Sequence, residues 1–228
     1  MPARAGPILV IHAAPTDRRQ SRTSRTKAFA SAPDWPGWSR AGKDEHLALE
    51  ALAASAARYR AVADEAGVAF DQAPLFEVVE TVQGGAGTEF GVPSVITELD
   101  RRPLSAVDAE RGARLVEAAW SVFDRVAAAS RADLRKGPRG GGRDRDKMIG
   151  HVIEADHAYA REIGVRLLPP SLDDRAAVDA ERGAMLDVLR RPSDGSPLAD
   201  RRWTARYAAR RIAWHALDHA WEMEDRTD

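Results

Sequence analysis

The chain has 228 residues, a formal net charge of −1 and no cysteine, and 44% of its residues are hydrophobic. This length suggests one or two domains, and the hydrophobic fraction suits a folded core rather than general disorder. The balanced charge argues against a surface made for nucleic acid or anionic membranes. Because cysteine is absent, disulfides, thiolate nucleophiles and cysteine-ligated metals are excluded, and any metal would need histidine and carboxylate ligands.

No stretch approaches the roughly 18 apolar residues that a membrane-spanning helix requires. The apolar run from Ile8 to Ile11 is short and gives way to His12, so it predicts a buried strand rather than a signal peptide. We therefore expect a cytoplasmic protein that has no membrane partner.

The first hundred residues mix strand and helix patterns. Aliphatic and β-branched residues predict strands, Pro36-Gly37 predicts a turn, and Asp44 is a candidate cap for a helix that ends at Gly67. We predict strands over 7–13, 27–31 and 75–82, a turn over 34–38 and a helix that opens at 43–45.

This order of elements, over about residues 7–83, resembles the small HicB-like fold. The resemblance is carried by Asp34-Trp35-Pro36-Gly37, by Gly42, and by Ala48-Leu49 at the start of the helix. It implies an antitoxin-type module, some of which carry a separate DNA-binding segment. This sequence shows no such segment, and its residues by themselves indicate a small α+β packing module without activity.

Residues 84–103 are rich in glycine and proline and have no periodicity, which predicts a linker. Beyond them, apolar residues recur at helical spacing, and glycine or proline separates the repeats. Four helices of similar length predict a four-helix bundle. The predicted fold is thus an α+β module (1–83), a linker (84–103) and an all-α bundle (104–228), with helices over 106–131, 144–163, 172–189 and 202–225.

Three histidines are the candidate metal ligands. His215 and His219 are four residues apart on the last predicted helix, so both imidazoles leave the same face, as does Glu222. This spacing is the one by which helical histidine pairs chelate a divalent metal. His151 lies at the edge of the inward stripe of the second helix of the bundle, where it is either a third ligand or a hydrogen-bonded core residue.

The second half, about residues 104–228, resembles the DinB/YfiT-like superfamily of four-helix bundles. The matching residues are His151, within Gly-His-Val-Ile-Glu-Ala-Asp-His-Ala-Tyr, and the pair His215-Ala-Leu-Asp-His219. The resemblance implies that these three side chains bind one divalent ion, zinc or nickel, and leave its remaining positions to water or substrate. The chain departs from the family after His219, where Ala-Trp-Glu-Met replaces the His-Arg-Gly-Gln-like tail of many members.

A metal held by neutral imidazoles lowers the pKa of bound water or binds a substrate thiol as thiolate. Glu222 and Glu154 are candidate catalytic residues, as proton acceptors or as carboxylates that orient an imidazole, and surface ion pairs are their alternative role. The loop over 136–147, with Arg139, Gly141 and Arg143, is a candidate binding loop for an anionic cosubstrate, or else a solvated connector.

We therefore predict a metal-dependent hydrolase, or a thiol-dependent transferase or isomerase, that acts on a small molecule. Because the chain has no cysteine, a reactive thiol would come from a low-molecular-weight cosubstrate. The alternatives are a non-catalytic regulatory protein with an antitoxin-type module, and a purely structural metal. We expect no nucleic-acid partner, because the basic segments lack interleaved aromatic residues. A homodimer is compatible with the sequence.

Overall fold

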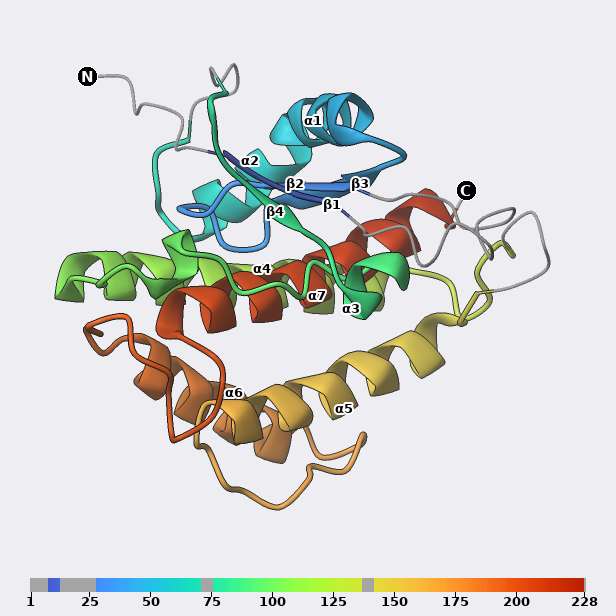
Figure 1. Ribbon diagram of the computed structural model, residues 1–228. Coiled ribbons are helices and arrows are strands. Elements are labelled where there is room, and N and C mark those ends of the chain that lie inside the picture. The colour runs from blue at the N-terminus through green and yellow to red at the C-terminus, as the bar shows by residue number, and fades with distance from the viewer. Residues whose placement is uncertain (1–7, 13–27, 71–75, 137–141, 228) are drawn as a thin grey trace.

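The computed structural model describes residues 8–12, 28–70, 76–136 and 142–227 of the chain. Figure 1 shows the sheet between two groups of helices, α1 and α2 on one side and α4 and α7 on the other; α5 and α6 lie beyond α4 and α7, away from the sheet. The described elements are β1 (Ile8–His12), β2 (Ala28–Ser31), β3 (Ser39–Gly42), α1 (Glu45–Ala54), α2 (Ala56–Glu65), β4 (Val78–Gln83), α3 (Ala86–Glu89), η1 (Leu99–Arg101), α4 (Ala106–Ala129), α5 (Arg145–Glu162), α6 (Arg175–Leu189) and α7 (Ala205–Asp225).

The sheet has the strand order β3-β2-β1-β4. Strand β2 pairs antiparallel with β1 and with β3, so that Ala30 lies opposite Val10 on one side and Arg40 on the other. Strand β4 runs parallel to β1, with Thr81 opposite Val10. A parallel pair needs a crossover connection, and α1 and α2 lie in that connection. All four residues of β2 are buried, since helices cover both faces of the sheet.

The predicted strands over 7–13, 27–31 and 75–82 correspond to β1, β2 and β4. Strand β3 was not predicted, because Ser39-Arg40-Ala41-Gly42 has neither a β-branched run nor an apolar alternation. The helix predicted from 43–45 to Gly67 forms in two pieces, α1 and α2, on either side of Ser55. Asp44 caps α1 as predicted, because its carboxylate accepts a hydrogen bond from the Leu47 amide at 2.9 Å.

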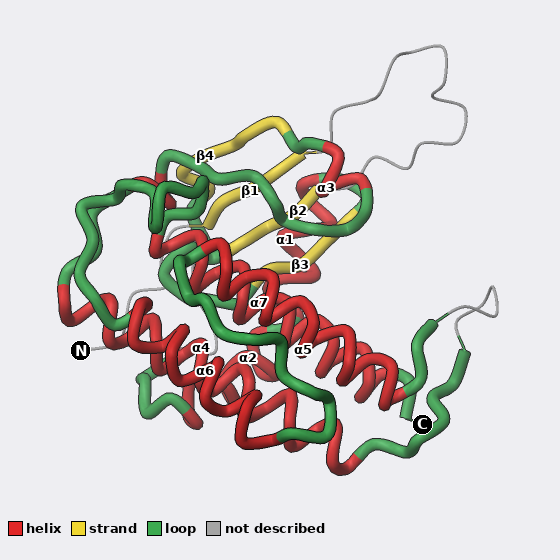
Figure 2. Tube along the Cα trace, turned by 90° about the horizontal axis from the view of Figure 1, so that it is seen from below, coloured by secondary structure: helices red, strands yellow, loops and turns green. Residues whose placement is uncertain are grey.

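The predicted helices of the C-terminal half correspond to α4, α5, α6 and α7. Helices α6 and α7 begin three residues later than predicted, because the side chains of Asp174 and Thr204 accept hydrogen bonds from their first turns. Helix α7 packs on α4 and α5, and α6 packs on the same two helices (Figure 2). The C-terminal part of the chain is therefore helical, as expected, and its assignment to the DinB-like bundle stays a prediction.

One buried cluster contains side chains from both halves of the chain. It joins Trp38 and Tyr59 of the N-terminal half to Leu115 of α4 and Ile212 of α7. The turn at Gly37 lies against α7: its φ is +91°, and an added Cβ would stand 2.7 Å from a methyl carbon of Leu217. The division into two domains at residues 83 and 104 stays a prediction. The two halves share one buried core.

The segment predicted as a linker lies against α7. Asp100, at the 3-10 turn η1, is 2% exposed and pairs with Arg210 of α7, which is 1% exposed. Arg210 also donates to the Val95 carbonyl at 3.1 Å, and the Thr204 hydroxyl donates to the Asp100 carbonyl at 2.7 Å. These polar contacts use side chains and backbone carbonyls. They hold the segment in place without the hydrophobic periodicity of a helix or strand.

Candidate metal centre

Helix α7 presents two of the predicted ligands. Thr204 caps the helix, and the alanine-rich sequence that follows has high helix propensity. His215 and His219 are buried, at 6% and 9% exposure, and their ring centroids lie 4.7 Å apart. The pair thus leaves one face of α7 together, as its four-residue spacing predicts.

Helix α5 places the third predicted ligand opposite this pair. The ring of His151 lies 5.0 Å from each of the other two rings, centroid to centroid, and its Nε2 atom is 3.2 Å from Nε2 of His215. One donor nitrogen from each of the three histidines can be chosen so that all lie within 4.8 Å of one another. The structure therefore brings the three predicted ligands together from two helices, although His151 and His215 are 64 residues apart in the chain.

The protonation of the cluster suits a metal site, because a metal binds the neutral imidazole. Burial, reinforced by the positive charges of His219 and Arg211, lowers the pKa of His215 to about 2. Burial likewise lowers the pKa of His151, with Arg143 contributing. In a tetrahedral site with Zn–N bonds of about 2.0–2.1 Å, two donor nitrogens lie about 3.3 Å apart. The Nε2 atoms of His151 and His215 have this spacing, at 3.2 Å, and the set of three donors lies within 4.8 Å.

Glu222 contacts both a histidine of the cluster and an arginine. Its Oε2 atom is 3.2 Å from Nδ1 of His219, and its Oε1 atom accepts a hydrogen bond from Arg226 at 2.7 Å. The hydrogen bond with His219 lowers the pKa of Glu222, and Arg226 adds to the effect, so the carboxylate is ionised at neutral pH. An ionised carboxylate favours the proton on Nδ1 and leaves Nε2 of His219 free to bind a metal.

The other predicted site residues lie farther from the cluster or outside the described residues. Glu154 is exposed, and its negative charge offsets part of the lowering of the His151 pKa by burial. Arg143 is exposed, and its positive charge lowers the pKa values of His151 and His215. Arg139 and Gly141 fall within 137–141, outside the described residues.

Arg211 belongs to the site but was missed in the sequence. Its guanidinium carbon lies 5.2 Å from the ring centroid of Tyr159 and 4.8 Å from that of Trp214. Both rings also flank His215, at 5.6 and 6.3 Å. One guanidinium nitrogen of Arg211, Nη1, is buried and has no hydrogen-bond partner. The available signal was spacing, since Arg211 lies one helical turn before His215.

The aromatic residues on α7 and just before it have two kinds of contact. Trp214 packs edge-on against Phe29 of the sheet, and Trp221 lies under the guanidinium of Arg40, 3.7 Å from its ring centroid. These two tryptophans are core residues that join α7 to the sheet. Trp203 instead packs at a tilt against Tyr159, 5.1 Å from centroid to centroid, beside the histidine cluster.

No protein-family model matches the chain, and comparisons with curated proteins and with solved structures found no similar protein. The DinB-like and HicB-like resemblances thus depend on the motifs alone. Among the described residues, no helix combines the length and the apolar character that crossing a membrane requires.

Proposed function

We propose that this chain is a divalent-metal-dependent enzyme whose metal is held by His151, His215 and His219. The observation that carries the proposal is the convergence of three buried or half-buried imidazoles from α5 and α7, with donor atoms within 4.8 Å. Zinc or nickel suits such a donor set, because both accept imidazole nitrogen as a ligand. The same residues support the assignment of the helical half to the DinB-like superfamily.

The surrounding residues indicate what the site can do. A divalent ion bound by three neutral ligands keeps its full charge and supplies a Lewis acid that activates water or a thiol. Glu222 orients His219 through Nδ1, and Glu154 is exposed near His151, where it can accept a proton. These roles suit a hydrolase, or a transferase or isomerase that uses a small thiol cosubstrate.

Arg211 supports an anionic small-molecule substrate. Its guanidinium lies beside the histidines, and its Nη1 group has a donor that nothing in the described protein uses. A buried donor without a partner costs about 1–3 kcal/mol, and a carboxylate or thiolate-bearing ligand at this place would satisfy it. Tyr159 and Trp203 would provide the apolar wall beside it.

Metal analysis tests the proposal. Protein purified without a histidine tag should contain about one divalent ion per chain, or should bind one from added zinc or nickel with a rise in melting temperature. The His215→Ala variant should lose this binding while its far-UV circular dichroism stays helical. His46→Gln is the matched control, because His46 is 80% exposed on α1 and far from the cluster in the chain.

Two outcomes would contradict the proposal. Protein that neither contains nor binds zinc or nickel has no such metal centre. His151 and His215 are then a hydrogen-bonded pair, with His219 beside them. A bound metal whose coordination is closed by protein, with no position for water or substrate, is structural rather than catalytic.

The alternative function, a regulatory protein with an antitoxin-type module, has a weaker basis in the structure. The turn that carries the HicB-like resemblance is packed against α7, where Gly37 meets Leu217. We therefore assign this turn a packing role. Copurification of a small toxin-like protein would favour the alternative.

A further inference from the structure

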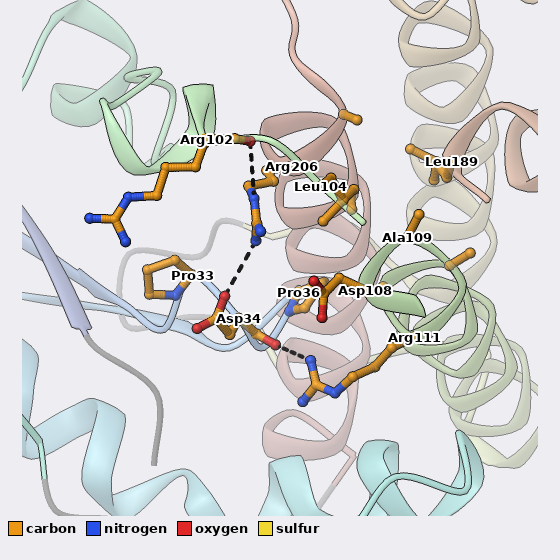
Figure 3. A pocket seen from close by; sticks show the side chains of 14 residues that line it. Pro33, Asp34, Pro36, Arg102, Leu104, Asp108, Ala109, Arg111, Leu189 and Arg206 are labelled. Atoms are coloured by element: carbon orange, nitrogen blue, oxygen red, sulfur yellow. Dashed lines mark hydrogen bonds and ion pairs between the residues drawn. The ribbon is translucent and has the colours of Figure 1, made fainter. Parts of the chain in front are cut away.

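A second site of interest lies in the first turns of α4 and α7, away from the histidines. There the structure has a cavity of about 450 Å³ between these helices and the loop that carries Pro33 and Asp34 (Figure 3). Arg206, at the edge of this cavity, precedes His215 by nine residues on α7. At a rise of about 1.5 Å per residue, the Cα atoms of these two residues lie about 14 Å apart along the helix axis.

The cavity is lined by more positive than negative charge. Three arginines, Arg102, Arg111 and Arg206, face two carboxylates, Asp34 and Asp108. Asp108 accepts a hydrogen bond from the Ser105 hydroxyl at the start of α4. Asp34 serves two arginines at once: its carboxylate accepts from Arg206 at 3.3 Å and its carbonyl from Arg111 at 2.5 Å.

Within the described part of the chain, no carboxylate is hydrogen-bonded to two of these arginines. Arg111 contacts the Asp34 carbonyl and the face of Trp35, whose ring centroid lies 4.2 Å from its guanidinium carbon. Burial lowers the pKa of Arg111, and the negative charges of Asp34 and Asp108 offset this only in part. Arg102 is exposed and extends on the Pro33 side of the cavity (Figure 3).

The remaining wall is apolar. It consists of proline, leucine and alanine side chains, from Pro33, Pro36, Leu104, Ala109, Leu189 and Ala205. A concave site with an apolar wall and a few convergent cations is suited to an amphipathic anion. We propose that this cavity binds a small organic anion, a carboxylate or a phosphate ester on a compact apolar body, independently of the metal.

Four probes of similar size test the proposal on the full-length protein. Benzoate and phenyl phosphate carry the expected anion, whereas benzyl alcohol is neutral and benzylammonium is cationic. We expect the two anions to raise the melting temperature and to give saturable binding by calorimetry, at ionic strength held constant with potassium chloride. Comparison of the two anions shows which anionic group the cavity prefers.

Gly112 offers a variant that blocks the cavity without disturbing the fold. It lines the cavity on α4, and an added Cβ would meet no heavy atom within 4 Å. Gly112→Leu should therefore fill the cavity and abolish anion binding, while Gly112→Ala should keep binding. Both replacements favour the helix over glycine, so loss of binding in Gly112→Leu would not reflect unfolding.

Arg102 offers a variant that removes charge. Because its side chain is exposed, Arg102→Gln should fold normally and weaken anion binding roughly tenfold, as loss of a hydrogen bond to a charged group does. Arg166→Gln is the control, since Arg166 is exposed, carries the same charge and does not line the cavity.

Each outcome decides the proposal. Binding of the anions that is lost in Gly112→Leu and weakened in Arg102→Gln, but kept in both controls, would support it. The proposal is overturned if neither anion binds, if the neutral or cationic probe binds as well, or if Gly112→Leu binds like the unmodified protein. That last result would place the anion elsewhere, for example at the metal.

Discussion

Asp100 and Arg210 form a two-pronged ion pair that is almost completely buried. The Nε and Nη2 atoms of Arg210 donate to the two carboxylate oxygens of Asp100 at 3.1 and 2.6 Å. This pair connects the segment before α4 to α7, the helix that carries two of the proposed metal ligands.

Replacement of one partner should destabilise the protein strongly. Asp100→Asn leaves the Arg210 charge buried without a counter-ion, which typically costs about 3–5 kcal/mol. Urea denaturation measures the change in the free energy of unfolding. Glu98→Gln is the control, because Glu98 is 85% exposed, and it should change stability by less than about 0.5 kcal/mol. Equal effects of the two variants would show that the pair is not important for stability.

Two glycines should respond in opposite ways to alanine. Gly37→Ala puts a Cβ at a φ of +91° and 2.7 Å from Leu217, so we expect a loss of at least about 2 kcal/mol. Gly112→Ala in α4 meets open space and should stabilise the protein by about 0.5–1 kcal/mol. Thermal and urea unfolding of both variants check the signs, and a stable Gly37→Ala protein would contradict the close approach of this turn to α7.

The two candidate carboxylates near the proposed metal centre should differ in their effect on metal binding. Glu222 contacts Nδ1 of His219, so Glu222→Gln should weaken metal binding roughly 10–100-fold. Glu154 makes no such contact, and Glu154→Gln should leave the affinity nearly unchanged. Competition with a chromophoric zinc chelator measures both. If the two variants bound zinc alike, the hydrogen bond from Glu222 would have no role in metal binding.

Asp156 should make stability depend on pH. Burial raises its pKa to about 6 although Arg182 lies 3.2 Å away. The folded state therefore disfavours the charged form: this cost is absent below about pH 4, builds up between about pH 4 and pH 6, and stays constant at higher pH. Relative to Asp156→Asn, the unmodified protein should lose about 2–3 kcal/mol of stability between pH 4 and pH 7. Urea denaturation of both proteins at these two pH values checks this, and a constant difference would refute it.

The sequence predicted the helical elements and the grouping of three histidines for a physical reason. Helical periodicity is a local signal, and the spacing of His215 and His219 fixes their relative direction on α7. The pairing with His151 is not local, since nothing in its own helix specifies which residue it faces. The motif resemblance predicted that His151 faces the pair on α7. In the structure, Nε2 of His151 lies 3.2 Å from Nε2 of His215.

The parts that the sequence did not reveal depend on contacts between distant residues. Strand β3 forms because Arg40 and its neighbours pair with β2, although their side chains lack a strand pattern. The segment around Asp100 is ordered against Arg210, more than 100 residues away. Arg211 resembles any other arginine of an arginine-rich chain until the fold places it between two aromatic rings.

The burial of α7 has a consequence for redesign of this protein. Fifteen of its 21 residues are buried, because α4, α5, α6 and the turn η1 pack on it and side chains of the sheet contact its tryptophans. A new substrate preference is therefore difficult to introduce on α7, where almost any larger side chain would disturb several neighbours. Libraries that aim to alter specificity should instead vary the exposed positions of α5 around Glu154, which border the histidines and have room to change.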